Sequence, residues 1–333
     1  MITETLKFSD AIELAKLGSE PLSVLLGNGF SRACRDDTFN YGSLWDRADF
    51  TLTGEKVEIE EAMNSKDFET VIRRLDRCAN LLAVYGGDSE IIGQIEADST
   101  AIRTGLAAAI ARLHPAHAWT LDSEERRNVN EFLAHFTSLF TTNYDLLLYW
   151  AVNHAASQSV PKDDGFRGSY DNGFKWRLSN SQKIYYLHGA IHLFEESSVT
   201  TKAARQDGLI MDEIRDRIAL QQHPLIVTEG SSIDKRVRIE ESKYLSNCYD
   251  QLGSLSGALF IHGSSLSSND EHLFNQITRE ESGITTLFVS VRPGSSEAQI
   301  RVRAHDLSKK RRSNGGTPLK LHFYDAESAH VWR

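Results

Sequence analysis

The stretch LSVLLGNGFS at residues 22–31 decides the fold. Its first five residues form a short apolar run, which ends at a turn that contains two glycines. Such short apolar runs are typical of strands buried on both faces, as in parallel sheets. The turn should then begin a helix. Glycines in that position let backbone N–H groups approach a pyrophosphate, whose negative charge is favoured at a helix N-terminus.

Taken alone, this turn is weak evidence for a nucleotide site. The full G-x-G-x-x-G pattern is absent, because Arg32 stands where the third glycine would be. An ordinary turn between a strand and a helix therefore remains an alternative at this point.

Other short apolar runs recur along the chain, and helical stretches separate most of them. They occupy residues 139–141, 184–187, 225–227, 258–261, 286–291 and 319–324. Strands that alternate with helices indicate an α/β fold with a doubly wound, Rossmann-like parallel sheet.

The gap between the first two expected strands is far longer than a strand–helix–strand unit needs. Apolar residues at helical spacing occur within 68–82, and 99–113 repeats the pattern. We therefore expect residues 45–135 to form a helical insertion beside the sheet, within a single domain that spans residues 1–333. The polar segment 153–182 should be a long loop or a short hairpin.

The overall charge argues against nucleic acid as a direct partner. The chain has 333 residues and a formal net charge of -9, so its surface as a whole repels phosphates. The basic run at 309–312 is a local exception. We expect these four residues to lie in a solvated loop before the last strand. The alternative is that they make a local contact to nucleic acid or to an acidic partner.

The cysteines and the apolar runs indicate a cytoplasmic protein without a metal site. Cys34, Cys78 and Cys248 are the only three cysteines and form no CxxC pair, which excludes a four-cysteine zinc site within one chain. The N-terminus is amphipathic and carries acids, unlike a signal peptide. No apolar run approaches the roughly 20 residues that span a bilayer.

Three further motifs follow expected strands. They are TTNYD at residues 141–145, the pair His188-Gly189, and Gly263-Ser264-Ser265. Because the carboxyl ends of parallel strands meet at one edge of a sheet, these motifs should converge there with the first turn. The simpler alternatives are that Asp145 caps a helix and that His188 is structural, with His192 competing for any role.

In this order the four motifs resemble those of the sirtuin-like superfamily, which carries a GAGxS loop, a TxNxD motif, a catalytic HG and a GTS turn. The corresponding residues here are GNGFS at 27–31, TTNYD at 141–145, HG at 188–189 and GSS at 263–265. The resemblance covers residues 20–292. The amino-acid sequence of these motifs is more similar to that of bacterial sirtuin-like defence proteins, and of a related uncharacterised bacterial family, than to that of deacetylases.

The resemblance implies that NAD⁺ is bound as a substrate. His188 would be the base that polarises a ribose hydroxyl or a water, and Asn143 would hold the nicotinamide ribose or orient the water. The other implied cofactor-binding residues are Gly27, Asn28, Gly29, Phe30, Ser31, Thr142, Asp145, Gly263, Ser264 and Ser265.

The chain lacks the zinc module of deacetylating sirtuins, with its two CxxC pairs, so no metal is expected and water is the favoured acceptor. The products would then be nicotinamide and ADP-ribose. Uncontrolled hydrolysis of NAD⁺ would kill the cell, so we expect an effector of antiphage defence that is controlled by homo-oligomerisation or by a partner. Without a Walker A motif here, any hexameric ATPase or sensor would be a separate protein.

Two other functions remain open from the sequence. One is a sensor or scaffold that binds NAD or ADP-ribose without turnover. The other is an ADP-ribosyltransferase or a deacylase. Release of nicotinamide separates hydrolysis from binding, and a labelled protein or acyl-peptide product identifies the transferase or deacylase.

Overall fold

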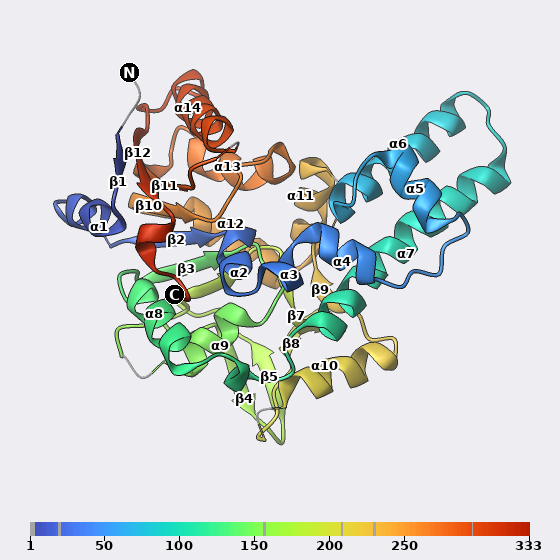
Figure 1. The fold of residues 1–333 in the computed structure, drawn as a ribbon, viewed down its shortest axis with the longest axis horizontal. Coiled ribbons are helices and arrows are strands. Elements are labelled where there is room, and N and C mark those ends of the chain that lie inside the picture. The colour runs from blue at the N-terminus through green and yellow to red at the C-terminus, as the bar shows by residue number, and fades with distance from the viewer. Residues whose placement is uncertain (1–3, 19–20, 156–157, 208, 229–230, 295) are drawn as a thin grey trace.

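A seven-stranded parallel sheet forms the centre of the molecule, with the order β1-β12-β11-β10-β2-β3-β6 (Figure 1). The computed structural model describes residues 4–18, 21–155, 158–207, 209–228, 231–294 and 296–333. The strands are β1 (Thr5–Leu6), β2 (Ser23–Leu26), β3 (Ser138–Thr141), β6 (Ile184–Tyr186), β10 (Ser256–His262), β11 (Gly283–Val291) and β12 (Lys320–Asp325). The expected Rossmann-like α/β fold is therefore confirmed.

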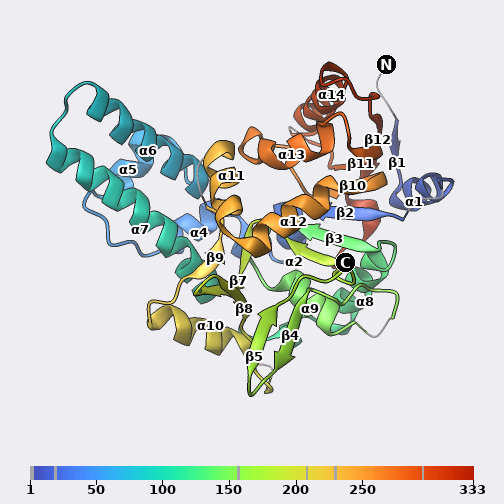
Figure 2. The same cartoon turned by 180° about the vertical axis from the view of Figure 1, so that it is seen from behind.

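Helices flank this sheet on both faces. Figure 1 shows α2 on one face, and Figure 2 shows α12 on the other. The flanking helices are α1 (Phe8–Lys16), α2 (Asn28–Cys34), α8 (Ser123–Leu133), α9 (Leu147–Asn153), α12 (Lys243–Gly253), α13 (Glu271–Thr278) and α14 (Glu297–Ser313). With helices on both sides, every residue of β2 is buried, which explains why its sequence is apolar without alternation.

The strand order has a switch point between β2 and β10. From β2 the chain proceeds to β3 and β6 on one side, and later returns to β10 on the other side of β2. The two strands are in register at their carboxyl ends, where Leu26 pairs with His262. In open α/β sheets, ligands bind in the crevice outside this point.

A second sheet of five strands in the order β4-β5-β8-β7-β9 was not expected. Its strands are antiparallel: β4 (Phe166–Ser169), β5 (Gly173–Trp176), β7 (Gly189–Glu196), β8 (Val199–Lys202) and β9 (Pro224–Ile226). The hairpin alternative for 153–182 is found as β4 and β5. The assignment of 225–227 to the parallel sheet is wrong, because β9 pairs with β7. Gly189, at a φ of +72°, allows this pairing, since a Cβ there would lie 1.9 Å from the carbonyl oxygen of Leu225.

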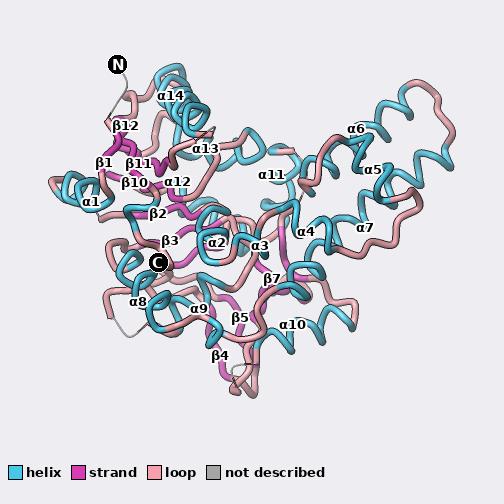
Figure 3. The backbone as a smooth tube through the Cα atoms, in the orientation of Figure 1, coloured by secondary structure: helices cyan, strands magenta, loops and turns pink. Residues whose placement is uncertain are grey.

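The chain between β2 and β3 is helical, and no strand occurs in residues 27–137, all of which are described. Besides α2 and α8 it contains α3 (Asp36–Phe39), α4 (Tyr41–Arg47), α5 (Lys56–Met63), α6 (Phe68–Val84), α7 (Ser89–Leu113) and the short 3-10 turn η1 (Ala118–Thr120). Helices α6 and α7 pack against each other as a hairpin that projects from the body of the molecule (Figures 1 and 3).

Four smaller elements complete the described chain. They are α10 (Ile210–Ala219), α11 (Ser232–Glu241) and the 3-10 turns η2 (Ser268–Asp270) and η3 (Glu327–Ala329). None of the helices in the described ranges has the length and apolar character needed to cross a membrane.

Candidate functional site

A cavity of about 810 Å³ lies at the carboxyl ends of the parallel strands, beside the switch point between β2 and β10. Its walls come from the segments that follow these strands and from α6 of the insertion. Among the expected site residues, those that line it are Gly27, Asn28, Gly29, Thr142, His188, Gly263, Ser264 and Ser265. Four loops that are far apart in the sequence therefore meet at one cavity, as the sequence predicted.

The glycines of the first turn let two loops touch. The N–H of Gly27 donates to the carbonyl of His262 (2.9 Å), and the N–H of Gly29 donates to that of Gly263 (2.8 Å). A Cβ on Gly29 would lie 2.6 Å from Cα of Gly263. These glycines thus serve the contact between the loops after β2 and β10, whereas the sequence had suggested that they make room for a phosphate.

Asn143 does not line the cavity but holds the Gly27–Ser31 turn in place through hydrogen bonds. Its Nδ2 donates to the carbonyl of Gly27 (3.1 Å) and to Oγ of Ser31 (2.8 Å). Ser31 in turn donates to Oδ2 of Asp145 (2.5 Å). The TTNYD and GNGFS motifs are therefore joined by a buried chain of hydrogen bonds.

Asp145 and Phe30 also lie beneath the cavity wall. Oδ1 of Asp145 accepts from the backbone N–H of Leu147 (2.8 Å), the first residue of α9, from one position before the N-cap residue Leu146. Burial raises the pKa of this carboxyl, although its hydrogen bonds oppose the shift. The ring of Phe30 packs against Trp332, whose indole donates to the carbonyl of Phe30 (2.9 Å).

His188 also lines the cavity, and it is almost fully buried, with 2% of its surface exposed. Its Nε2 lies 3.0 Å from Nε2 of His272, so one ring donates and the other accepts. Burial, with Lys235 nearby, holds the pKa of His188 well below its usual value. The imidazole is consequently neutral at neutral pH.

Next to His188 lies a charged cluster, which we define as Glu69, Lys235 and Asp270. Glu69 and Lys235 are buried, and Asp270 is partly exposed. Nζ of Lys235 is 2.8 Å from Oε2 of Glu69 and 2.9 Å from Oδ1 of Asp270, which is itself 3.9 Å from Nε2 of His188. Both acids line the cavity, whereas the lysine is fully buried behind them. With both acids ionised, the cluster carries one net negative charge.

The pKa values in the charged cluster diverge. Burial raises the pKa of Glu69 to about 7, although Lys235 opposes the shift. Burial acts to raise the pKa of Asp270, but the charge and hydrogen bond of Lys235, together with His188 and His272, lower it on balance. The two carboxylates raise the pKa of Lys235 despite its burial.

The charged cluster was not expected from the sequence. The sequence offers no clear signal for it, because two of the apolar residues of α11, Ile233 and Val237, are exposed. Lys235 instead shares its buried face with Ile239. Its partners could not be identified, since Glu69 is 166 residues away in the insertion.

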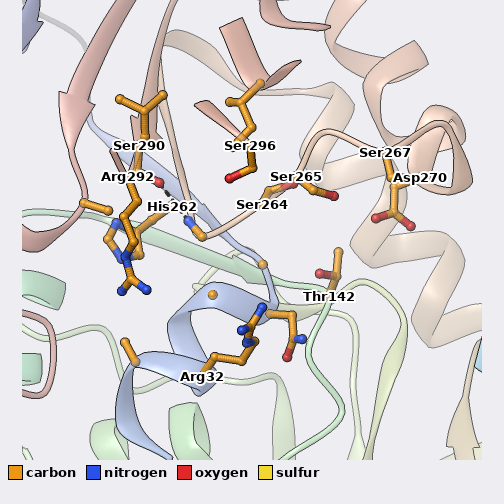
Figure 4. A pocket seen from close by; sticks show the side chains of 18 of the residues that line it. Arg32, Thr142, His262, Ser264, Ser265, Ser267, Asp270, Ser290, Arg292 and Ser296 are labelled. Atoms are coloured by element: carbon orange, nitrogen blue, oxygen red, sulfur yellow. Dashed lines mark hydrogen bonds between the residues drawn. The ribbon is translucent and has the colours of Figure 1, made fainter. Parts of the chain in front are cut away.

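The lining also includes cationic side chains. They are Arg292, which lies 3.4 Å from Glu327, Arg32, which pairs with Asp36 at 2.6 Å, and Arg333. In Figure 4, Arg292 and Asp270 lie on opposite sides of the Ser264–Ser265 loop. The cavity therefore offers a ligand cations, small polar groups and the charged cluster.

His192, which had seemed a competitor of His188, is a core residue. It is fully buried between the rings of Tyr149 and Tyr186 and does not line the cavity. In the part of the chain that the structure describes, no group of three or more His, Cys, Asp or Glu side chains is placed to hold a metal ion.

The chain belongs to a family described as a domain of unknown function (DUF4917), whose model matches residues 24–332. No curated protein matches the chain. The match thus includes the parallel sheet apart from β1 and the first residue of β2, and nearly all of the cavity lining, without assigning an activity to them.

Proposed function

We propose that the cavity binds NAD⁺ and that the protein hydrolyses the bond between nicotinamide and ribose, giving nicotinamide and ADP-ribose. One observation carries this proposal: the loops after β2 and β10 and the His188 segment after β6 line a single cavity at the switch point. This is where dinucleotides lie on doubly wound sheets.

The size and charge of the cavity support a dinucleotide. Its volume of about 810 Å³ lies within the range of roughly 300–1,000 Å³ that is usual for ligand sites. Arg32 and Arg292 suit an anionic ligand such as a pyrophosphate, which would replace or share their present partners Asp36 and Glu327. With His188 at the nicotinamide ribose, the adenosine would extend towards these arginines.

The charged cluster suits the chemistry of this cleavage. When the bond breaks, its electron pair goes to the pyridinium nitrogen, nicotinamide leaves neutral, and positive charge develops on the ribose. Lys235 holds the carboxylates of Glu69 and Asp270 in place, so they would stabilise the positive charge in the transition state without having to rearrange. Water then adds to C1 of the ribose and releases a proton.

The resemblance to sirtuin-like defence proteins extends the proposal to the cell. We place the protein among cytoplasmic effectors of bacterial antiphage defence that work as homo-oligomers. A separate sensor protein or hexameric ATPase would control them, because unregulated loss of NAD⁺ is lethal.

One observation favours a second function, binding without turnover. His188 is neutral and deeply buried, and the amide of Asn143 is engaged with Gly27 and Ser31 instead of facing the cavity. A protein that only senses NAD⁺ or ADP-ribose would need no stronger base than this.

Product analysis with a His188→Ala variant tests the proposal. We expect the wild type, assembled as its native oligomer, to release nicotinamide from NAD⁺. We expect release to fall roughly tenfold in His188→Ala, because losing one hydrogen bond costs about 0.5–1.5 kcal/mol, while NAD⁺ still binds. The melting temperature should also fall, because the change leaves Nε2 of His272 without its buried partner. His223→Ala, at an exposed site, is the control. Binding without nicotinamide release in the wild type would support the sensor, and absence of both would reject the proposal.

A further inference from the structure

The proposed hydrolysis releases one proton, which some group in the cavity must accept. Oxygen of the attacking water bonds to C1 of the ribose, the electron pair of the broken bond stays with nicotinamide, and one water proton leaves. A general base works best when its pKa is near the working pH.

His188 is a poor acceptor for this proton. Burial and the ammonium of Lys235 hold its pKa well below the usual value, and its Nε2 already shares a proton with His272. A protonated His188 would add a second buried cation next to Lys235. The imidazole is better suited to hydrogen-bonding than to taking up a full proton.

Glu69 is better placed to accept it. The residue lines the cavity from the first turn of α6, and Lys235 fixes its Oε2 at 2.8 Å. Its Oε1 lies 3.2 Å from Oη of Tyr144, which also lies 2.6 Å from the carbonyl of Val227. An ionised carboxylate accepts about four hydrogen bonds, so these contacts leave room for a water.

The contact with Tyr144 also offers a place for the proton. While Glu69 is ionised, Oη of Tyr144 is the donor to both its Oε1 (3.2 Å) and the carbonyl of Val227 (2.6 Å), since both oxygens only accept. Once Glu69 is protonated, its Oε1 can donate to Oη of Tyr144. The site therefore holds hydrogen-bond partners for the carboxyl in both protonation states.

Charged groups from several elements surround Glu69. Lys235 comes from α11 and Asp270 from η2, Asp67 caps α6, and His188 and His272 lie beyond Asp270. Burial raises the pKa of Glu69 to about 7, with Asp270 and Asp67 in the same direction and Lys235 against it. Because Lys235 keeps its proton and Asp270 stays ionised, Glu69 is the member of the charged cluster that titrates near neutrality.

We propose that Glu69, supplied by the helical insertion, is the catalytic residue that accepts the proton of the attacking water, with Lys235 and Asp270 as positioning residues. This inference rests on the proposed hydrolysis. It goes beyond it by assigning the general base to the insertion instead of to the sheet.

The test is the pH profile of nicotinamide release from NAD⁺, measured for wild type and Glu69→Gln. The wild-type rate should rise with pH through about 7, because the base must be ionised. In Glu69→Gln the rate should fall about 100- to 10,000-fold, and the rise near pH 7 should vanish. NAD⁺ affinity, measured by calorimetry, should change only a few-fold. Glu61→Gln, which removes the same charge from an exposed site on α5, should leave the rate and profile unchanged.

A second variant guards against a folding defect. Glu69→Ala opens space at the carboxylate, and added formate should restore part of its rate while leaving Glu61→Gln unaffected. A folded Glu69→Gln that keeps the wild-type rate or the rise near pH 7 would overturn the assignment of Glu69 as the base. The proposed hydrolysis of NAD⁺ would still stand. If neither variant folds, a wild-type rate that is flat from pH 6 to 8 overturns it. A wild type that binds NAD⁺ but releases no nicotinamide overturns the proposed function as well.

Discussion

Asn143 shows how one residue's neighbours change its expected role. The TTNYD motif suggested contact with a ribose or a water. In the structure its amide instead ties the GNGFS turn to the end of β3, through the carbonyl of Gly27 and the hydroxyl of Ser31. A side chain engaged in this way acts on the ligand through the loop that it holds.

Replacing Asn143 with alanine should therefore weaken both the fold and the binding of NAD⁺. The change removes the amide that donates to the buried hydroxyl of Ser31 and one of two donors to the carbonyl of Gly27, which keeps the N–H of Phe30 (2.9 Å). Such a loss costs about 1–3 kcal/mol. Urea unfolding and calorimetric titration with NAD⁺ measure the two effects.

Asn153→Ala is the control, because that exposed amide donates to the carbonyl of Tyr149 within the same helix. If Asn143→Ala kept the wild-type stability and NAD⁺ affinity but lost nicotinamide release, Asn143 would instead act directly on the reacting ribose.

At the scale of elements, the close approach of two loops defines the cavity wall. Gly29 and Gly263 bring the turns after β2 and β10 into backbone contact. The apolar runs and glycines of these segments were enough to predict strands followed by turns. That the glycines face each other follows only from the register of β2 with β10, which pairs Leu26 with His262.

Gly29→Ala should destabilise the protein through this contact. The new Cβ would lie 2.6 Å from Cα and 2.8 Å from the carbonyl oxygen of Gly263, and backbone atoms cannot rotate away. Overpacking of this kind costs about 1–3 kcal/mol, and the strained loops should also bind NAD⁺ less tightly. Gly93→Ala is the control, because Gly93 lies on α7 with open space around it. This change should instead raise the free energy of unfolding by about 0.5–1 kcal/mol. Equal unfolding curves for Gly29→Ala and wild type would show that the loops separate easily.

The insertion illustrates what helical spacing does and does not predict. The apolar face of α6 is buried near its start, at Phe68, Val71 and Ile72, whereas Leu82 near its end is 37% exposed. The same periodicity therefore continues into a part of the hairpin that projects from the body (Figure 1). Spacing identified the helix, but only packing placed its first turn, with Glu69, at the cavity.

At the scale of the whole molecule, several histidines are buried in the neutral form. Burial lowers the pKa of His114 and His262 to about 4 and that of His272 to about 3. His114 shows the reason for its neutral form, since its Nε2 accepts from the N–H of Leu146 (3.0 Å) and can do so only without a proton. The pKa values of His188 and His192 are likewise well below the usual one.

These histidines should make the protein less stable as the pH falls below about 6.5. Between that value, which is typical of the unfolded chain, and pH 4, the unfolded state binds protons that the folded state excludes. Each such histidine then costs up to about 1.4 kcal/mol per pH unit. Glu69 acts in the opposite direction, because its raised pKa favours the folded state at low pH, but the histidines outnumber it.

Urea unfolding at pH 7.5 and pH 5.5 measures this dependence. The free energy of unfolding should be lower at pH 5.5, and His223→Ala, at an exposed site, should show the same difference as wild type. Equal stability at the two pH values would mean that the buried histidines do not titrate as their surroundings indicate.

The sequence by itself determined the parallel sheet and the meeting of four loops at one edge. Short apolar runs that end in glycine or small polar residues specify buried strands and their turns locally, and the geometry of parallel strands brings those turns together. The segments after β2, β3, β6 and β10 could therefore be assigned to one site without knowing any contact between them.

Only the tertiary structure decided the second sheet, the burial of Asn143 and the charged cluster at the cavity. The partners of Lys235 lie 166 and 35 residues away in the chain, on α6 and η2. No local pattern encodes their meeting, because it depends on how the insertion packs beside the sheet. The chemistry of charged groups buried together is set by distance and loss of water, and both exist only once the chain has folded.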